Sequence, residues 1–180
     1  MQYGQFYQIE GSKREGSKIL NFVFLHKALS VDCFSRGAMQ YMYVKDGVAT
    51  TTDGRRLHQI KKVDLPNGFY EFKKSSSPLR FSWFVEVKDN VGEYPDIERV
   101  IPTGDCFETK YMGDTTIPYG GGRNILRFLY SLPEKTGINM QYLIDLGSSQ
   151  TYNVKWYGKM KAIVFENERR KALIMPFQLE

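Results

Sequence analysis

The sequence of 180 residues has few of the side chains on which catalysis and covalent cross-linking depend. It contains only two cysteines, Cys33 and Cys106, and only two histidines, His26 and His58. Cysteines so far apart argue against a disulfide framework or a zinc site, and we expect reduced thiols. The histidines offer few general bases, and no serine or cysteine accompanies them in a recognisable nucleophile arrangement. We therefore expect a protein without catalytic activity, cofactor or metal.

Long hydrophobic runs are also missing. No apolar run approaches the ~20 residues that a membrane-spanning helix requires. The first ten residues, MQYGQFYQIE, lack the basic-then-apolar pattern of a secretory signal, so we expect a cytoplasmic protein without membrane contact. Hydrophobic residues make up 42% and aromatic residues 14% of the chain, which is typical of a globular protein.

The chain carries more positive than negative charge. The formal net charge is +5 and the pI is about 9.1, which permits contact with a polyanion without establishing it. Basic residues occur in pairs along the chain, and the plainest interpretation is that they occupy solvated loops and strand ends. These pairs include Arg55-Arg56, Lys61-Lys62, Lys73-Lys74 and Arg169-Arg170.

Two segments have the apolar spacing of amphipathic helices. In residues 21–31, one face is apolar and the other carries Lys27. A second helix is predicted to begin at Gly120-Gly121-Gly122 and to end at Pro133. On its polar face, Arg123 and Arg127 lie four residues apart. Its apolar stripe comprises Ile125, Leu126, Phe128, Leu129 and Leu132.

Strand-like segments follow each helix. After the first come residues 38–44, 48–52 and 56–63, separated by Asp46-Gly47 and Asp53-Gly54 turns. The later ones are residues 138–146, 151–157, 159–165 and 171–177. The pattern predicts an α+β protein in which a helix-plus-antiparallel-sheet unit occurs twice, with the helices packed under the sheets. We expect one domain over 1–180, with a first repeat at about 17–88, a connector at about 89–105 and a second repeat at about 106–180.

Three short motifs carry a resemblance to a known family. VATTTDGRRLH, residues 48–58, resembles the signature turn of bacterial sliding clamps, the DNA polymerase III beta subunit family. EYPDIERVIP, residues 93–102, resembles the linker between the second and third domains of that family, and ALIMPFQLE, residues 172–180, resembles its C-terminus. The motifs occur in the order that the family has, so the resemblance implies a DNA-clamp-like fold.

In such clamps the three segments line a surface pocket that captures short peptides from DNA polymerases and other replication or repair proteins. By the resemblance, Leu57 would form the floor of this pocket. Arg56 would line it with the stem of its side chain while the charge stays solvated. Met175 would repack around different peptides. The residues implied in peptide binding are Thr52, Gly54, Arg56, Leu57, Pro95, Arg99, Val100, Leu173, Met175, Pro176 and Phe177.

Clamp helices also present basic side chains to DNA, and two clamp chains close a ring around the duplex. Lys27, Arg123 and Arg127 match that role here, and such contacts would be independent of DNA sequence and sensitive to salt. Helix-surface charge is the competing interpretation. This chain has about half the family's length, so a ring would need about six copies, and a monomer or dimer that never encircles DNA stays open. Arg55 replaces the usual histidine and Gln178 the usual arginine of the family, changes expected to alter partner preference.

The leading interpretation is a sliding-clamp-like, processivity-factor-type accessory of DNA replication that binds clamp-binding peptides and contacts or encircles duplex DNA. A regulator that competes for clamp-binding partners without encircling DNA is the alternative. The carboxylates of the connector leave a third, remote alternative, a metal-dependent enzyme acting on nucleic acid, although their spacing does not support a metal site. These carboxylates are Asp89, Glu93, Asp96 and Glu98.

Overall fold

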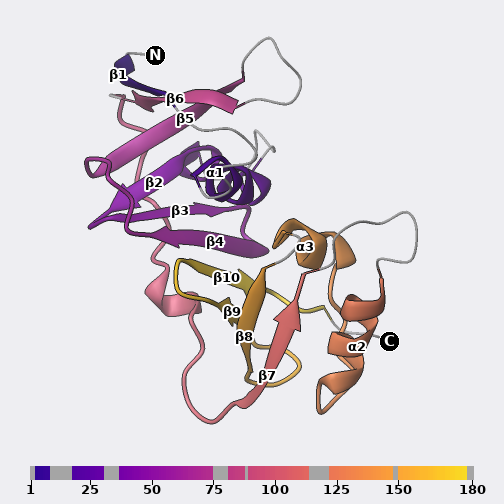
Figure 1. Ribbon diagram of the computed structural model, residues 1–180. Coiled ribbons are helices and arrows are strands. Elements are labelled where there is room, and N and C mark those ends of the chain that lie inside the picture. The colour runs from indigo at the N-terminus through magenta and orange to yellow at the C-terminus, as the bar shows by residue number, and fades with distance from the viewer. Residues whose placement is uncertain are drawn as a thin grey trace. The chain divides into compact units, whose positions relative to one another are not determined.

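A computed structural model of the chain describes residues 3–8, 18–30, 37–74, 81–87, 89–113, 122–147 and 150–177. The chain divides into two compact units, Met1–Pro95 and Asp96–Glu180, each of which is described by itself (Figure 1). The division falls inside the predicted connector at about 89–105. The assignment of a single domain to 1–180 stays a prediction. Cys33, Gly120, Gly121 and Gln178 lie outside the described residues.

Unit 1 contains an antiparallel sheet with the strand order β1-β6-β5-β2-β3-β4. The Asp46-Gly47 turn joins β2 to β3, and its residues have φ of 50° and 74°, the left-handed values that a tight two-residue hairpin requires. This predicted hairpin is confirmed. The strands are β1 Tyr3–Gln8, β2 Met42–Lys45, β3 Val48–Thr52, β4 Arg56–Lys61, β5 Gly68–Lys74 and β6 Phe81–Val87.

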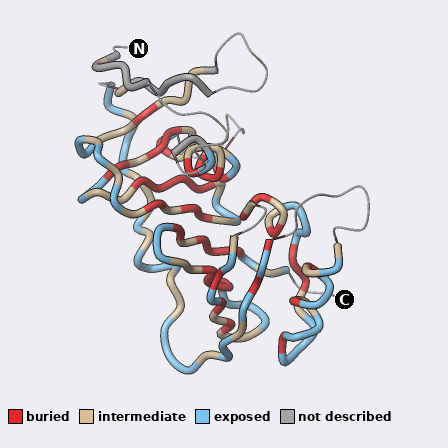
Figure 2. Tube along the Cα trace, viewed as in Figure 1, coloured by how far each residue is buried: buried red, intermediate tan, exposed pale blue. Residues whose placement is uncertain are grey.

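Helix α1 of unit 1 spans Lys18–Lys27, so the predicted helix at 21–31 exists but begins and ends earlier than expected. It packs on β3 and β4, and Phe24, Leu25 and Ala28 are buried as the apolar spacing predicted. A short 3-10 helix, η1 at Gly37–Gln40, precedes β2. Figure 2 shows the buried residues of unit 1 concentrated along β2, β3 and β4 and on α1.

Unit 2 contains a second antiparallel sheet with the order β10-β9-β8-β7. Phe128 of α2 packs its ring against Tyr111 of β7 and Phe165 of β9, with ring centroids 5.2 and 5.5 Å apart. These aromatic contacts fix α2 on the sheet. The elements are η2 Glu98–Val100, β7 Phe107–Met112, α2 Arg123–Ser131, α3 Met140–Asp145, β8 Thr151–Trp156, β9 Ile163–Glu166 and β10 Arg170–Ile174.

The strand predicted at 138–146 is wrong, because this segment forms α3. The side chain of Asn139 accepts a hydrogen bond from the Gln141 amide at 2.9 Å, which caps the helix N-terminus. Leu143 and Leu146, three residues apart, are both fully buried, a spacing that suits a helix better than a strand. Gln141 also donates to Asp145 one turn on, at 2.9 Å.

Each unit thus combines an antiparallel sheet with helices on it, as the predicted α+β class requires. In the described part of the chain, no helix has the length and apolar character needed to cross a membrane.

Candidate functional site

The turn at Thr52–Arg56 is held by its own side chains. Gly54 has a φ of 86°, which a residue with a Cβ rarely adopts, so glycine is required there. The Gly54 amide donates to the Thr52 hydroxyl (3.1 Å), which itself donates to the carbonyl of Arg56 (2.6 Å). The Asp53 carboxylate accepts hydrogen bonds from the amides of Arg55 and Arg56, both at 2.9 Å. The turn is therefore rigid before any ligand is considered.

Arg56 does not keep its charge in solvent, as the resemblance implied it would. Its side chain is only 11% exposed, and Nε lies 3.0 Å from the Asp53 carboxylate. Its Nη2 donates to the backbone carbonyl of Lys27, at the last residue of α1. A cation at this end of a helix also interacts favourably with the helix dipole. Arg55, by contrast, is exposed.

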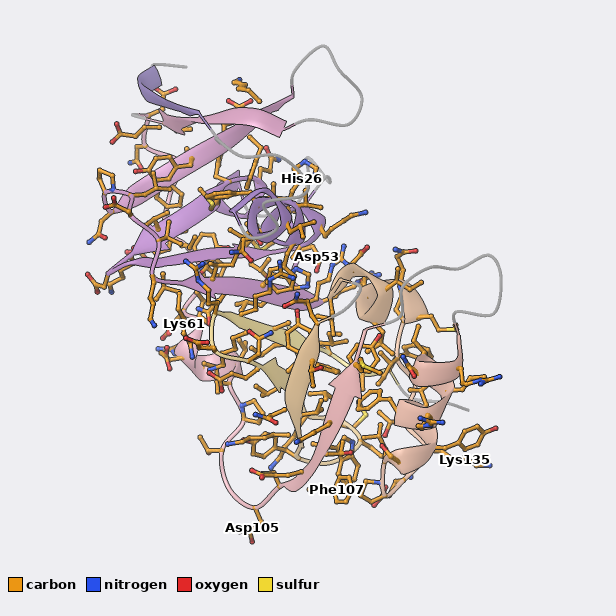
Figure 3. The ribbon with its side chains drawn as sticks, in the orientation of Figure 1. His26, Asp53, Lys61, Asp105, Phe107 and Lys135 are labelled. Atoms are coloured by element: carbon orange, nitrogen blue, oxygen red, sulfur yellow. The ribbon has the colours of Figure 1, made fainter. Side chains whose placement is uncertain are left out.

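Two further side chains on β3 and β4 bind the end of α1. The Thr51 hydroxyl donates to the carbonyl of Leu25 at 2.6 Å. Nδ1 of His58 lies 2.6 Å from the carbonyl of Phe24, and because a carbonyl only accepts, Nδ1 carries the hydrogen. The His58 ring stacks on the Phe24 ring at 4.0 Å. Since a helix leaves its last carbonyls without intrahelical partners, Thr51, Arg56 and His58 together cap α1. Figure 3 shows the turn, marked by Asp53, beside α1.

Leu57 and Thr52 point the other way. They are direct partners across β3 and β4, and because side chains alternate along a strand they lie on the sheet face opposite Arg56 and His58. Leu57 is 4% exposed, so it presents almost no surface to a ligand. The structure therefore brings Thr52 and Leu57 together and separates them from the guanidinium of Arg56.

The end of β10 exposes apolar side chains. Leu173 is buried, whereas Met175 is 41% and Phe177 52% exposed, with Pro176 partly exposed between them. We call Met175, Pro176 and Phe177 the C-terminal apolar surface. The Phe177 amide donates to the carbonyl of Gly137 at 2.9 Å, and a Cβ on Gly137 would come within 2.6 to 2.8 Å of Phe177. Gly137 thus positions Phe177, a role that no sequence signal revealed.

The linker residues are divided by the unit boundary. Pro95 is the last residue of unit 1, whereas Arg99 and Val100 belong to η2 in unit 2. Arg99 pairs with Asp96 at 2.9 Å, and because both side chains are well exposed this pair contributes little stability. Val100 is exposed. The convergence of turn, linker and C-terminal strand on one pocket stays a prediction.

The three predicted DNA-contacting residues are exposed. Lys27 lies at the end of α1, and Arg123 and Arg127 lie one turn apart on α2. Within the described ranges, neither arginine of α2 has an ion-pair partner.

Groups of metal-binding side chains are not found in the described residues, where no three His, Cys, Asp or Glu lie close enough together to hold a metal ion. Asp96 is paired with Arg99 and also accepts from the Glu98 amide at 3.2 Å. Cys106 is a free thiol.

Comparison with solved structures gives matches along the whole chain. The sliding clamp of Bacillus subtilis superposes with a TM-score of 0.57 at 13% identity, over 100% of this chain and 66% of the clamp chain. The DNA polymerase III beta chain of Streptococcus pneumoniae gives 0.57 at 14%, over 97% and 64%. The Helicobacter pylori beta clamp, solved with a DNA ligase peptide, gives 0.56 at 11%, over 97% and 66%. This chain has the sliding-clamp fold.

The predicted resemblance to bacterial sliding clamps is therefore confirmed for the fold, and the DNA-clamp-like α+β class with it. No protein-family profile and no characterised protein sequence matches the chain significantly. The sliding-clamp fold is present here in a chain that spans about two thirds of the length of the clamps it matches.

Proposed function

We propose that this chain is a sliding-clamp-like accessory protein of DNA replication that holds clamp-binding peptides on its C-terminal apolar surface. One observation carries the proposal. In a chain with the clamp fold, the buried strand β10 runs directly into Met175 and Phe177, whose large apolar side chains are 41% and 52% exposed. Adjacent exposed apolar side chains of this size commonly mark an interaction site.

The chemistry of the surface suits exchangeable peptide partners. Met175 is flexible and polarisable and adapts to different apolar side chains, while Phe177 is held in place by Gly137. A peptide that covers about 250 Å² of apolar area would gain roughly 6 kcal/mol at ~25 cal/mol per Å². Additional polar contacts and the cost of ordering the peptide set the affinity in roughly the micromolar range.

One solved neighbour supports this type of ligand, since the Helicobacter pylori clamp was solved with a DNA ligase peptide. The Bartonella birtlesii clamp was solved with griselimycin. The partners that we propose are DNA polymerases and other proteins that carry clamp-binding motifs. Among the other predicted pocket residues, Arg56 is not proposed to contact the peptide because it caps α1. Thr52, Leu57 and Leu173 are not proposed to do so because they are buried. The remaining ones stay in the proposal.

We also propose that Lys27, Arg123 and Arg127 contact duplex DNA through its phosphates, without sequence preference. Their exposure and the positive charge of the chain favour this contact. The protein is proposed to act in the cytoplasm as a binding protein and not as an enzyme.

The rival function is a regulator that competes for clamp-binding partners without encircling DNA. The observation in its favour is that Met175 and Phe177, the side chains proposed to hold the peptide, both belong to unit 2, so peptide binding by itself requires no ring. Light scattering separates the two functions, because a ring requires a closed oligomer, whereas a stable monomer would leave only the regulator.

The peptide proposal is tested by titrating a fluorescent clamp-binding peptide against the wild type, Met175→Ala and Phe177→Ala. Removing either side chain should weaken binding about 5- to 30-fold, which corresponds to about 1–2 kcal/mol of lost apolar burial. Met112→Ala is the matched control, because Met112 is also exposed but ends β7, at the opposite edge of the unit 2 sheet. A wild type that binds no peptide, or a control that loses as much affinity, contradicts the proposal.

A further inference from the structure

The outward face of α2 has an unusual composition. Ile125 and Phe128 are buried against the unit 2 sheet. With 3.6 residues per turn, the positions opposite them are 123, 126, 127 and 130. Their occupants are Arg123, Leu126, Arg127 and Tyr130, which we call the α2 stripe.

All members of the α2 stripe are accessible. Tyr130 is 87% exposed, and Leu126 is 51% exposed, although its spacing in the sequence predicts a place in the apolar stripe of the helix. Within the described part of the chain, the Tyr130 side chain has no hydrogen-bond or ring partner. A ring this exposed adds nothing to the core, so packing does not explain why a tyrosine occupies the position.

The charged residues of the α2 stripe are all positive. Helix α2, with the sequence RNILRFLYS, contains two arginines and no acidic residue. Glu134, which follows the helix, is exposed and pairs with Lys159 at 3.3 Å. The stripe is therefore complementary to an anionic ligand, and its helix N-terminus adds further positive potential near Arg123.

We infer that the α2 stripe binds single-stranded nucleic acid, with a base stacked on Tyr130 and the adjacent phosphates on Arg123 and Arg127. The inference rests on the proposed function and extends its DNA contact from the duplex to single strands. An aromatic ring beside cationic side chains is the combination that proteins use to hold single strands without sequence preference, because every base has a π face. In a duplex the faces of the bases are stacked on one another and cannot stack on Tyr130, so a duplex contacts only the two arginines through its phosphates.

A protein partner fits this face less well. The stripe lies on the convex surface of a helix, whereas an apolar peptide binds in a groove that covers its anchor side chains. The density of arginine and the absence of acidic residues on α2 also favour a polyanion.

The test measures the affinity of the full chain for single-stranded oligo(dT) of about 15 nucleotides and for a duplex of the same length, by fluorescence anisotropy. The variants are Tyr130→Ala, Tyr130→Leu and Tyr130→Phe, and the control is Met140→Ala, which removes an exposed side chain from α3, outside the α2 stripe. Tyr130→Ala and Tyr130→Leu should weaken oligo(dT) binding roughly 5- to 150-fold, because each loses the stacking ring. Tyr130→Phe and Met140→Ala should stay within about twofold of the wild type, and duplex affinity should change by less than about twofold in all variants. Because Tyr130 is exposed, melting temperatures should be unchanged.

The double variant Arg123→Ala/Arg127→Ala separates this inference from the proposed DNA contact. It should weaken binding of both probes and reduce the dependence of affinity on salt. If it does so while Tyr130→Ala binds oligo(dT) like the wild type, the stacking inference is overturned and the phosphate contact stands. If the double variant changes neither probe, the proposed DNA contact fails as well. If Tyr130→Ala weakens the binding of an acidic peptide but binds oligo(dT) like the wild type, the α2 stripe is a protein-docking face, and the inference is overturned.

Discussion

Replacement of Arg56 by alanine should destabilise unit 1 while changing little exposed surface, because the Arg56 side chain is only 11% exposed. In the structure, the guanidinium joins the turn to the end of α1 through Asp53 and the carbonyl of Lys27. Alanine removes both interactions and leaves that carbonyl without its charged donor. The expected result is partial loss of the cap of α1.

The magnitude follows from the two interactions. A hydrogen bond from a charged group contributes about 1.5–3 kcal/mol, and the lower end of this range applies here because the bond to the Lys27 carbonyl is exposed. The side chain of Asp53, the partner in the ion pair, is 20% exposed. Because Asp53 keeps its hydrogen bonds from two backbone amides when Arg56 is replaced, loss of the ion pair adds only about 0.5 kcal/mol. The sum is roughly 2 kcal/mol, which corresponds to a fall in melting temperature of about 4 to 8 °C for a chain of this length.

Urea denaturation followed by circular dichroism measures this loss, and the neighbouring arginine supplies the control. Arg55→Ala removes an identical charge from an exposed side chain and should change the free energy of unfolding by less than about 0.5 kcal/mol. Arg56→Lys should lie between the two, because lysine keeps the charge but lacks the planar fork that reaches both partners. Equal stabilities of Arg55→Ala and Arg56→Ala would refute the assignment of Arg56 as a cap.

Two further predictions concern other contacts. Gly137→Ala should displace Phe177, since its Cβ would lie 2.6 Å from the Phe177 carbonyl oxygen, and should weaken peptide binding about as much as Phe177→Ala. In the control variant Gly122→Ala, the added Cβ would have no atom within 4 Å, so this variant should bind peptide normally. Equal loss of peptide affinity in both variants would refute the Gly137 contact. Burial raises the pKa of the Tyr94 hydroxyl above its ordinary value, so stability should fall as the pH rises above about 10, where only the unfolded chain ionises readily. Tyr94→Phe should reduce this alkaline loss, as measured by urea titrations between neutral pH and about pH 11, and an unchanged pH profile would contradict the assignment.

The sequence was sufficient to predict elements whose signals are local. The Asp46-Gly47 hairpin follows from the left-handed conformations that these residues tolerate, and α1 follows from the spacing of Phe24, Leu25 and Ala28. The prediction for 138–146 was wrong because this segment has enough apolar residues for a buried strand. In the structure it forms a helix, whose N-terminus is capped by Asn139. Periodicity alone rarely separates a short buried helix from a strand.

Contacts between distant segments could not be predicted in this way. The position of Phe177 depends on Gly137, forty residues earlier in the sequence, and neither residue type signals the other. Likewise, the exposure of Leu126 depends on how α2 is rotated on the sheet. The spacing of apolar residues on α2 spreads over more than one face, and the contact of Phe128 with Tyr111 and Phe165 selects which face is buried.

The clamp-like turn motif now has a structural explanation that requires no ligand. Gly54 permits the turn, and Thr51, Arg56 and His58 satisfy the carbonyls at the end of α1. Such a motif would persist in any chain that keeps this helix on this sheet, whether or not it binds peptides. The motif is therefore evidence for the fold rather than for the pocket. Evidence for the pocket must come from residues that the fold does not need, and the exposed side chains of Met175 and Phe177 are of that kind, because burial does not account for them.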